Sequence, residues 1–405
     1  MAPVLAGFPA VLEFISSTSL LAITIFCCVP SLHKPVRQHA RPWVVFHVQR
    51  GFSWVRFFQR HQSPLITLLA SLSSHTVSVP FYVSFLPILV LIGAEDAGSK
   101  ATILMAWCQY VGNALKDLIC APRPINVTDG ETSVTLLALP AREETELNAK
   151  EYGLPSSHTM NSLCLNLYLA IRVIEAYELS TIASSLLYAV VALWVVWIAI
   201  ARVYMGMHTP VDVIGGAVAG LFVLLSYLAF DDMIFSSLDQ GYGVGLQVLV
   251  SAVLLRLHPK PEVQTPSIEF SAAFAGAGLG VAAGRARLSF AGMIPLQSPN
   301  NPAAFILQGL RHCIIGLSTV AATKYFSKAI FLKCLPHVYA AVPQHLRKLW
   351  QPPMHHLGPG KADGIPCDAT GRAWDISMTA RFFSYFLLVY VGVYESLHWC
   401  MYFHW

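Results

Sequence analysis

Three short stretches of this sequence combine cations or imidazoles with residues that can bind an anion. They are 116–124 (KDLICAPRP), 155–158 (PSSH) and 202–212 (RVYMGMHTPVD). Each adjoins an apolar run, so we expect each to lie near a membrane surface, where charged side chains cost far less than at the bilayer centre. Taken singly, they have ordinary explanations as positive anchors, a helix cap and a structural ion pair. Taken together, they predict a phosphoryl-transfer site.

The cations of these stretches are suited to holding a phosphate dianion, which needs several fixed positive charges and hydrogen-bond donors. Lys116, Arg123 and Arg202 supply three positive charges. Ser156 and Ser157 come just before an apolar run that predicts a helix, and the N-terminal amides of a helix bind anions. We therefore expect these five residues to form a phosphate cradle.

The two histidines of the motifs supply nucleophile and proton chemistry, because one imidazole can attack phosphorus while the other protonates the departing alkoxide. Thr209-Pro210-Val211-Asp212 has the pattern of a capping box with proline at the first helical position. Asp212 can then accept a hydrogen bond from one ring nitrogen of His208. Such a bond would fix the tautomer and leave the other nitrogen free to attack. His158 remains as the second imidazole.

Composition indicates a polytopic membrane protein. The chain has 405 residues, of which 55% are hydrophobic and only 12% charged, whereas soluble domains have roughly 25% charged residues. The net charge of +4 is small and the basic residues are spread over several loops, which argues against nucleic-acid binding. The nine cysteines include no CxxC pair and read as buried apolar residues rather than as a disulfide framework or metal site.

The apolar runs predict an all-α fold, a polytopic helical membrane bundle. A spanning helix needs about 20 apolar residues, and by this criterion we expect about nine transmembrane helices. The candidate spans are 65–93, 101–118, 158–177, 181–202, 211–230, 241–256, 269–284, 302–323 and 382–400. The Gly/Ala-rich run 269–284 suits close helix packing in lipid. The run 11–29 contains Glu13 and either spans the membrane or lies at its interface.

We expect the chain to be organised around one membrane domain. Residues 1–62 form an N-terminal region with membrane or interfacial helices, and basic residues among Trp and Phe favour an interfacial helix over 43–60. Residues 63–232 form the catalytic membrane core. Residues 233–405 form a C-terminal transmembrane region with a long polar loop over 333–378.

Two features outside the motifs have competing interpretations. Arg311 lies in the middle of the run 302–323, and a charge buried in lipid is either functional or paired within the bundle; pairing is the simpler interpretation. The histidines of the 333–378 loop lack the regular spacing of metal ligands. No carboxylate cluster converges on the three motifs, so we expect neither a metal nor another cofactor.

The three motifs, in this order, resemble those of the type 2 phosphatidic acid phosphatase superfamily: Lys-x6-Arg-Pro, Pro-Ser-x-His and Arg-x5-His-x3-Asp. The resemblance implies that His208 is the nucleophile, Asp212 its orienting carboxylate and His158 the general acid. It assigns the phosphate cradle to Lys116, Arg123, Ser156, Ser157 and Arg202. The chain departs from the pattern in having Ser157 where glycine is usual, and Ala201 where serine is usual. The second change removes one possible hydrogen bond.

The residues around the second and third motifs, 153–161 and 203–208, resemble the sphingosine-1-phosphate phosphatase branch, especially plant-like long-chain base phosphate phosphatases. The close resemblance covers about 100–230. It implies metal-independent dephosphorylation of a lipid phosphate monoester through a phospho-histidine intermediate, with sphingosine-1-phosphate or a related long-chain base phosphate as substrate. It also implies a multi-pass protein of the endoplasmic reticulum membrane with a lumenal active site.

Several alternatives remain open at this point. The same chemistry could act on phosphatidic acid, a polyprenyl diphosphate or a sugar phosphate. A transporter or a non-catalytic scaffold would also explain the hydrophobicity, although neither needs three ordered phosphate motifs. The basic stretches 34–60 and 324–372 fall on the same side as the motifs, and the positive-inside rule would then place the site in the cytosol. The sequence does not predict the oligomeric state.

Overall fold

The structure is a computed structural model that describes residues 29–126, 150–263, 265–292, 302–343, 361–362, 365–366 and 374–402. The candidate span 11–29 lies outside them except for its last residue, as does most of the 333–378 loop. The described part is built almost entirely of helices, which confirms the expected all-α fold.

The chain divides into two compact units. The first comprises Met1–Phe81, Trp107–Ala229 and His258–Ile268, and the second Tyr82–Ala106, Phe230–Leu257 and Glu269–Trp405. The three-part division at 62 and 232 stays a prediction.

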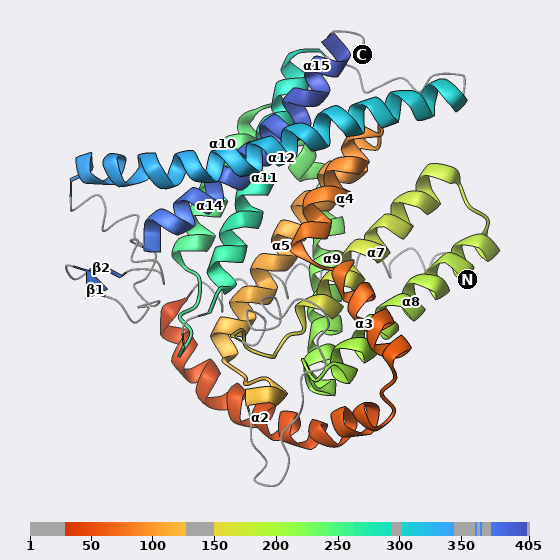
Figure 1. Cartoon of the computed structure of the whole chain (residues 1–405), viewed down its shortest axis with the longest axis vertical. Coiled ribbons are helices and arrows are strands. Elements are labelled where there is room, and N and C mark those ends of the chain that lie inside the picture. The colour runs from red at the N-terminus through yellow and green to blue at the C-terminus, as the bar shows by residue number, and fades with distance from the viewer. Residues whose placement is uncertain are drawn as a thin grey trace, which may run out of the picture. The chain divides into compact units, whose positions relative to one another are not determined.

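The first unit carries all three motifs, and Figure 1 labels the helices α5, α7, α8 and α9 that adjoin them. Its elements are α2 (Pro30–Arg60), α3 (Pro64–His75), the second half of α5 (Glu95–Ile119), η1 (Pro124–Asn126), α7 (Ser157–Tyr177), α8 (Thr181–Tyr204) and the first part of α9 (Pro210–Asp239). Helix α8 packs against α7, α3 and α2. Serine caps begin two of these helices: Ser63 accepts from the Ile66 amide and Ser180 from the Ala183 amide.

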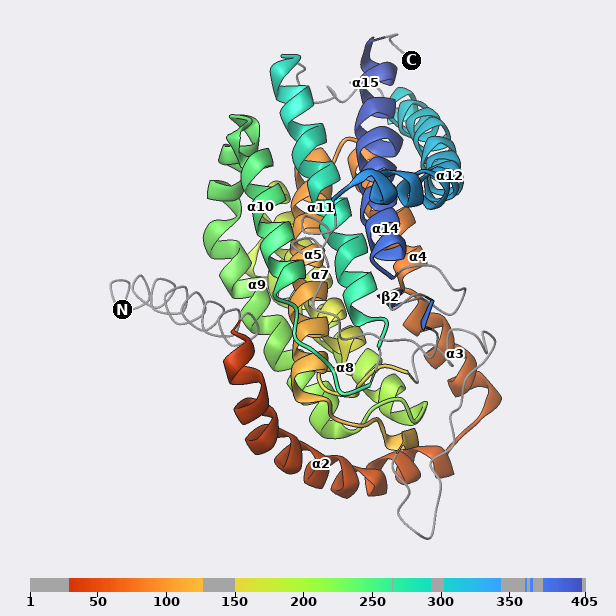
Figure 2. The same cartoon turned by 90° about the vertical axis from the view of Figure 1, so that its left-hand side faces the viewer.

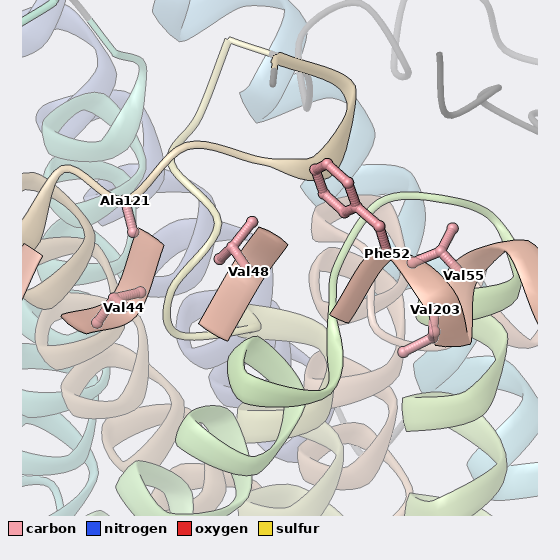
Figure 3. Packing of buried hydrophobic residues seen from close by; sticks show 6 residues of the cluster. All are labelled: Val44, Val48, Phe52, Val55, Ala121 and Val203. Atoms are coloured by element: carbon pink, nitrogen blue, oxygen red, sulfur yellow. The ribbon is translucent and has the colours of Figure 1, made fainter. Parts of the chain in front are cut away.

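Helix α2 is amphipathic and longer than the expected 43–60 helix. One face places Val44, Val48, Phe52 and Val55 against residues at the ends of α5 and α8. Figure 3 shows this row of side chains, with Ala121 near one end and Val203 near the other. Aromatic side chains, among them Trp43 and Trp54, are exposed on the other face. Helix α2 therefore closes the end of the first unit from which the motif loops emerge.

The second unit is also helical. It contains α4 (Val79–Leu91), except its first residues, together with α10 (Tyr242–Arg256), α11 (Ser267–Phe290), α12 (Pro302–Ala341), the two-residue strands β1 (Lys361–Ala362) and β2 (Ile365–Pro366), α14 (Trp374–Val389), the π-helix η2 (Tyr390–Glu395) and α15 (Ser396–Tyr402). Helix α12 packs along α14 and η2, and α11 lies beside α14 (Figure 2). A Cβ at Gly280 would lie 2.8 Å from the carbonyl oxygen of Phe386. This close approach supports the expected role of the Gly/Ala-rich run.

Among the described helices, four are long and apolar enough to cross a membrane, or up to five if the bent pair α3 and α4 forms one span. The four are α8, α9, α11 and the helical stretch Ile376–Cys400. On α8, the exposed apolar side chains Ile182, Leu186 and Leu193 recur at helical spacing, which suits contact with lipid. The chain is therefore a multi-pass membrane protein.

The expected count of about nine spans is not confirmed. Helices α5 and α7 do lie where the candidates 101–118 and 158–177 were expected. However, they do not belong to the set that meets the length and hydropathy criteria. Helix α5 also begins with Glu95 and Asp96 and ends near Lys116 and Asp117. The polar residues that form the site, and those that hold the site residues in place, thus lower the hydropathy of these helices.

Candidate active site

The structure brings all eight predicted site residues to the ends of helices in the first unit. Lys116 lies in the last turn of α5 and Arg202 in the last turn of α8. Ser157 and His158 begin α7 and Ser156 is its N-cap residue, Arg123 follows α5, and His208 and Asp212 lie at the start of α9. The side chains are buried except for those of Ser157 and His158, which are half-buried. His208 lies within electrostatic reach of Arg123, Arg202, Lys116 and His158.

Backbone hydrogen bonds join the motifs to each other. The Ser156 amide donates to the Asp212 carbonyl (2.9 Å), and the Gly153 amide donates to the Ala121 carbonyl (2.8 Å). Helix α9 comes so close to the start of α7 that a Cβ at Gly216 would lie 2.5 Å from the Ser156 carbonyl oxygen. Glycine at 216 thus allows the second and third motifs to meet. The relative positions of the site residues are fixed by this backbone contact as well as by their side chains.

The start of α9 has the predicted architecture. The helix begins at Pro210, and the Thr209 carbonyl accepts from the amides of Asp212 and Val213. The Asp212 carboxylate reaches back to the Thr209 amide (2.7 Å) and hydroxyl (2.9 Å). This is the reach of the acidic residue in a capping box. The carboxylate therefore stabilises the first turn of the helix that carries it.

The expected hydrogen bond between Asp212 and His208 is not formed. His208 Nδ1 lies 3.8 Å from Asp212 Oδ2, too far for a hydrogen bond, because that oxygen is engaged by Thr209. The buried Nδ1 atom of His208 and the Oδ1 atom of Asp212 have no hydrogen-bond partner among the described residues. The two groups face each other at ion-pair distance, so a small shift would join them.

The other ring nitrogen of His208 contacts a cation of the first motif. Arg123 Nη1 lies 3.3 Å from His208 Nε2, and it also donates to the Met207 carbonyl (3.2 Å). Arginine has no acceptor, so Nε2 must present its lone pair. In a neutral ring the proton then resides on Nδ1, on the side of Asp212. In this tautomer Nε2 carries the free lone pair of the ring.

Electrostatics keep that ring neutral. Burial lowers the pKa of His208 well below its usual range, and the nearby Arg123 and Arg202 cations lower it further. An uncharged imidazole has a free lone pair, which nucleophilic attack requires. The same cations that would attract an anion therefore also hold His208 in its neutral form.

Sequence reasoning missed Glu151, a buried carboxylate among the cations. It forms an ion pair with Lys116, and its Oε2 lies 3.5 Å from Arg123 Nη2. Its carbonyl oxygen accepts from Arg123 Nε (2.9 Å). Burial alone would raise the pKa of Glu151, but the adjacent Lys116 and Arg123 lower it below its usual value, so the carboxylate stays ionised. The only available signal was an acidic residue just before the second motif, in a region where buried cations need a counter-ion.

A second missed cluster fixes the end of α5 next to Lys116. The Asp117 carboxylate accepts from His258 Nε2 (3.0 Å) and from the Thr265 hydroxyl (2.8 Å). Arg37 of α2 donates to the Asp117 carbonyl (2.9 Å). These bonds tie α2 and the segment His258–Ile268 to the helix end that carries the first motif.

The two other sequence interpretations can be compared with the described residues. Arg311 is exposed on α12, and no ion pair of Arg311 is found among the described residues, so the expected pairing inside the bundle is not observed. Its neighbour His312 is buried instead, with Nδ1 3.3 Å from the Leu91 carbonyl oxygen. Within the described ranges, no group of three or more His, Cys, Asp or Glu side chains is arranged to hold a metal ion.

Comparison with known proteins agrees with this geometry. The model of the PAP2 superfamily matches residues 97–235, which include all three motifs. The chain is 31% identical over 385 residues to "Lipid phosphate phosphatase delta" of Arabidopsis thaliana, covering 90% of this chain and 91% of that protein. It is 26% identical over 277 residues to a "Dihydrosphingosine 1-phosphate phosphatase" of Schizosaccharomyces pombe, covering 67% of this chain and 64% of the relative.

A third relative is "Sphingosine-1-phosphate phosphatase 2" of Mus musculus, 23% identical over 269 residues, which cover 63% of this chain and 71% of the mouse protein. No solved structure matches the chain. The family match spans the residues that build the site, and the Arabidopsis relative extends the similarity over nearly the whole chain. The chain therefore belongs to the PAP2 superfamily, among its lipid phosphate phosphatases.

Proposed function

We propose that this protein removes the phosphate from a sphingoid base phosphate, such as sphingosine-1-phosphate, through a phospho-His208 intermediate. The observation that carries the proposal is the 3.3 Å contact between Arg123 Nη1 and His208 Nε2. It aims the lone pair of a neutral imidazole at a cation that can bind a phosphate oxygen. A phosphate held by Arg123 would thus lie next to the nucleophile.

The remaining cradle residues surround this point. Lys116 and Arg202 add two buried cations, and the electrostatic influence of both reaches His208. Ser156 precedes α7, whose first amides lack acceptors within the helix. The buried Ser157 hydroxyl has no hydrogen-bond partner among the described residues. Together these groups can bind the phosphate oxygens and stabilise the charge that they carry in the transition state.

The reaction has two steps. In the first, His208 Nε2 attacks phosphorus, the bond between phosphorus and the ester oxygen breaks, and His158 donates a proton to the departing alkoxide. Burial and the nearby Arg202 and Lys116 cations lower the pKa of His158 well below its usual range, so His158 takes up this proton as the phosphate dianion binds beside it. In the second, His158 accepts a proton from water as the water oxygen attacks phosphorus, and the bond to Nε2 breaks to release inorganic phosphate. Asp212 stabilises the positive charge that develops on the His208 ring while the phosphoryl group is attached.

The choice of substrate is supported by the names of the relatives and by the resemblance of the second and third motifs to the sphingosine-1-phosphate phosphatase branch. The exposed apolar faces of helices such as α8 suit a substrate whose chain stays in the bilayer. The resemblance to that branch implies the endoplasmic reticulum membrane as the location, with a lumenal site, and we propose both on this ground. Co-localisation of the tagged full-length chain with a marker of that membrane tests the location.

Phosphate release by the purified full-length chain in detergent, with EDTA present, tests the activity. Sphingosine-1-phosphate and phosphatidic acid are compared, and the proposal predicts release from the sphingoid substrate, lost in His208→Ala. His61→Ala is the matched control, because His61 is exposed and, within the part of the chain that the structure describes, its ring forms a hydrogen bond only to its own helix. Release that persists in His208→Ala would overturn the mechanism. Equal release from both lipids would overturn the substrate choice, and release from neither would favour a transporter or scaffold.

A further inference from the structure

Glu151 is, besides Asp212, a buried anion in a site whose cations are arranged to bind an anion. Its side chain is only 9% exposed and pairs with Lys116 and Arg123. These are two of the three cations that the phosphate of a substrate would use. A carboxylate with no role in the site would weaken phosphate binding, since like charges in a buried site repel each other strongly.

The backbone holds Glu151 in place, so the carboxylate cannot easily leave. Arg123 Nε donates to its carbonyl oxygen. The two residues that follow are also tied down: the Tyr152 hydroxyl accepts from the Val263 amide (3.0 Å), and the Gly153 amide donates to the Ala121 carbonyl. The carboxylate therefore stays beside a phosphate that binds to Lys116 and Arg123.

When a phosphate binds to Lys116 and Arg123, these two cations would pair less strongly with the Glu151 carboxylate. A buried, ionised carboxylate without a cation is strongly unfavourable, so the substrate complex needs another positive group next to Glu151. A phosphate ester that brings its own ammonium group supplies it. In a sphingoid base phosphate the amine is on the carbon adjacent to the phosphate-bearing carbon, which places the ammonium within reach of a carboxylate at the edge of the phosphate site.

We propose that Glu151 determines substrate specificity by binding this ammonium group, so that the site selects amino-phosphate esters over lipid phosphates without an amine. The inference rests on the proposed function and deepens it. The three cations and the N-terminus of α7 bind the phosphate, while Glu151 binds the neighbouring ammonium group. Phosphatidic acid carries no such charge and leaves Glu151 without a partner.

The test compares kcat/KM for sphingosine-1-phosphate and for its analogue with a hydroxyl group in place of the amine, using the full-length chain in detergent. The wild-type protein should prefer the amine by about 10-fold or more, because a site built around a buried polar partner rejects the analogue that lacks it. Glu151→Gln should abolish the preference chiefly by losing activity on the amine. The matched control Glu262→Gln, which removes a carboxylate that binds Arg41 at the surface, should keep it.

Equal loss of activity on both lipids in Glu151→Gln would overturn the proposal, because it would mean that Glu151 only orients Lys116 and Arg123. An unchanged preference would also overturn it. A second measurement needs no variant: phosphoethanolamine should inhibit the wild-type chain more strongly than ethylene glycol phosphate, and equal inhibition would contradict the proposal. Failure of the proposed function itself is recognised separately, by absent hydrolysis or by activity that survives in His208→Ala.

Discussion

Replacing Gly216 by alanine should damage both the stability and the activity of the protein. A Cβ at this position would lie 2.5 Å from the Ser156 carbonyl oxygen and 3.3 Å from the Ser156 Cβ. The nearest atom belongs to the backbone and cannot rotate away, so α9 must move from the start of α7. The same movement would strain the bond from the Ser156 amide to the Asp212 carbonyl, which joins two motifs of the site.

The magnitude follows from two opposing effects. Overpacking of this kind costs about 1–3 kcal/mol. Alanine in a helix interior recovers about 0.5–1 kcal/mol relative to glycine. The clash is with backbone and therefore lies at the unfavourable end of the overpacking range, so the expected net loss is about 2–2.5 kcal/mol. Thermal unfolding of the full-length chain in detergent measures the loss, and kcat/KM for phosphate release should fall in parallel because the cradle is displaced.

Gly245→Ala is the matched control. Gly245 lies within α10, and a Cβ there would have no neighbour within 4 Å. Alanine at 245 should leave activity unchanged and should not lower stability. Wild-type stability and activity in Gly216→Ala would refute the argument that close packing of α9 on α7 holds the site together. Equal damage in both variants would show that loss of glycine, rather than this contact, is responsible.

Two further predictions concern the His208 pair. Asp212→Asn should lower kcat/KM by a factor on the order of 10²–10⁴, because the neutral amide stabilises the charged His208 ring poorly. The same change should lower the stability of the protein by about 1 kcal/mol, because it weakens the cap at Thr209. Near-wild-type phosphate release would contradict the role of Asp212. The lowered pKa of His208 means that its neutral form persists below about pH 6.5, the ordinary histidine value. The fall of kcat/KM at acid pH should therefore follow the second ionisation of the substrate phosphate, near pH 6 for an alkyl ester. For a more acidic aryl phosphate this fall should occur at a lower pH. A fall at the ordinary histidine pKa for both substrates would contradict the prediction that His208 stays neutral.

The membrane class and the helix starts could be predicted from the sequence because their signals are local. Proline at 210 and an acid at 212 define the first turn of α9, and the structure begins the helix there. The three motifs all lie at helix ends because charged residues stand where apolar runs stop. The catalytic roles of these residues remain predictions, since proximity alone does not assign them.

The partners of the site residues could not be predicted because they are distant in sequence. Glu151 pairs with Lys116 across 35 positions, and Asp117 binds His258 across 141. No periodicity links such residues, so only the folded chain reveals them. The expected bond between His208 and Asp212 failed for a different reason: Thr209 lies closer to the carboxylate and offers two donors.

The number of spans could not be read from hydrophobicity alone. Helix α5 is apolar enough in its middle to resemble a span, but it carries charged residues at both ends. Lys116 and Asp117 are nevertheless buried because the site and its supporting cluster pair with them. A hydropathy window treats these charged residues as the exposed ends of a helix. Their burial depends on partners that are distant in sequence, which the window does not register.

Trapping of the covalent intermediate tests the central claim most directly. In the His158→Ala variant the general acid and base is lost, so an aryl phosphate, whose leaving group departs without a proton, should still phosphorylate His208, while hydrolysis of the intermediate slows. The account predicts a burst of one phenol per active site and an acid-labile, base-stable phosphate on the peptide that contains His208, both absent when His208→Ala is added. Label on another residue, or steady turnover without a covalent intermediate in the rapidly quenched enzyme, would contradict the account.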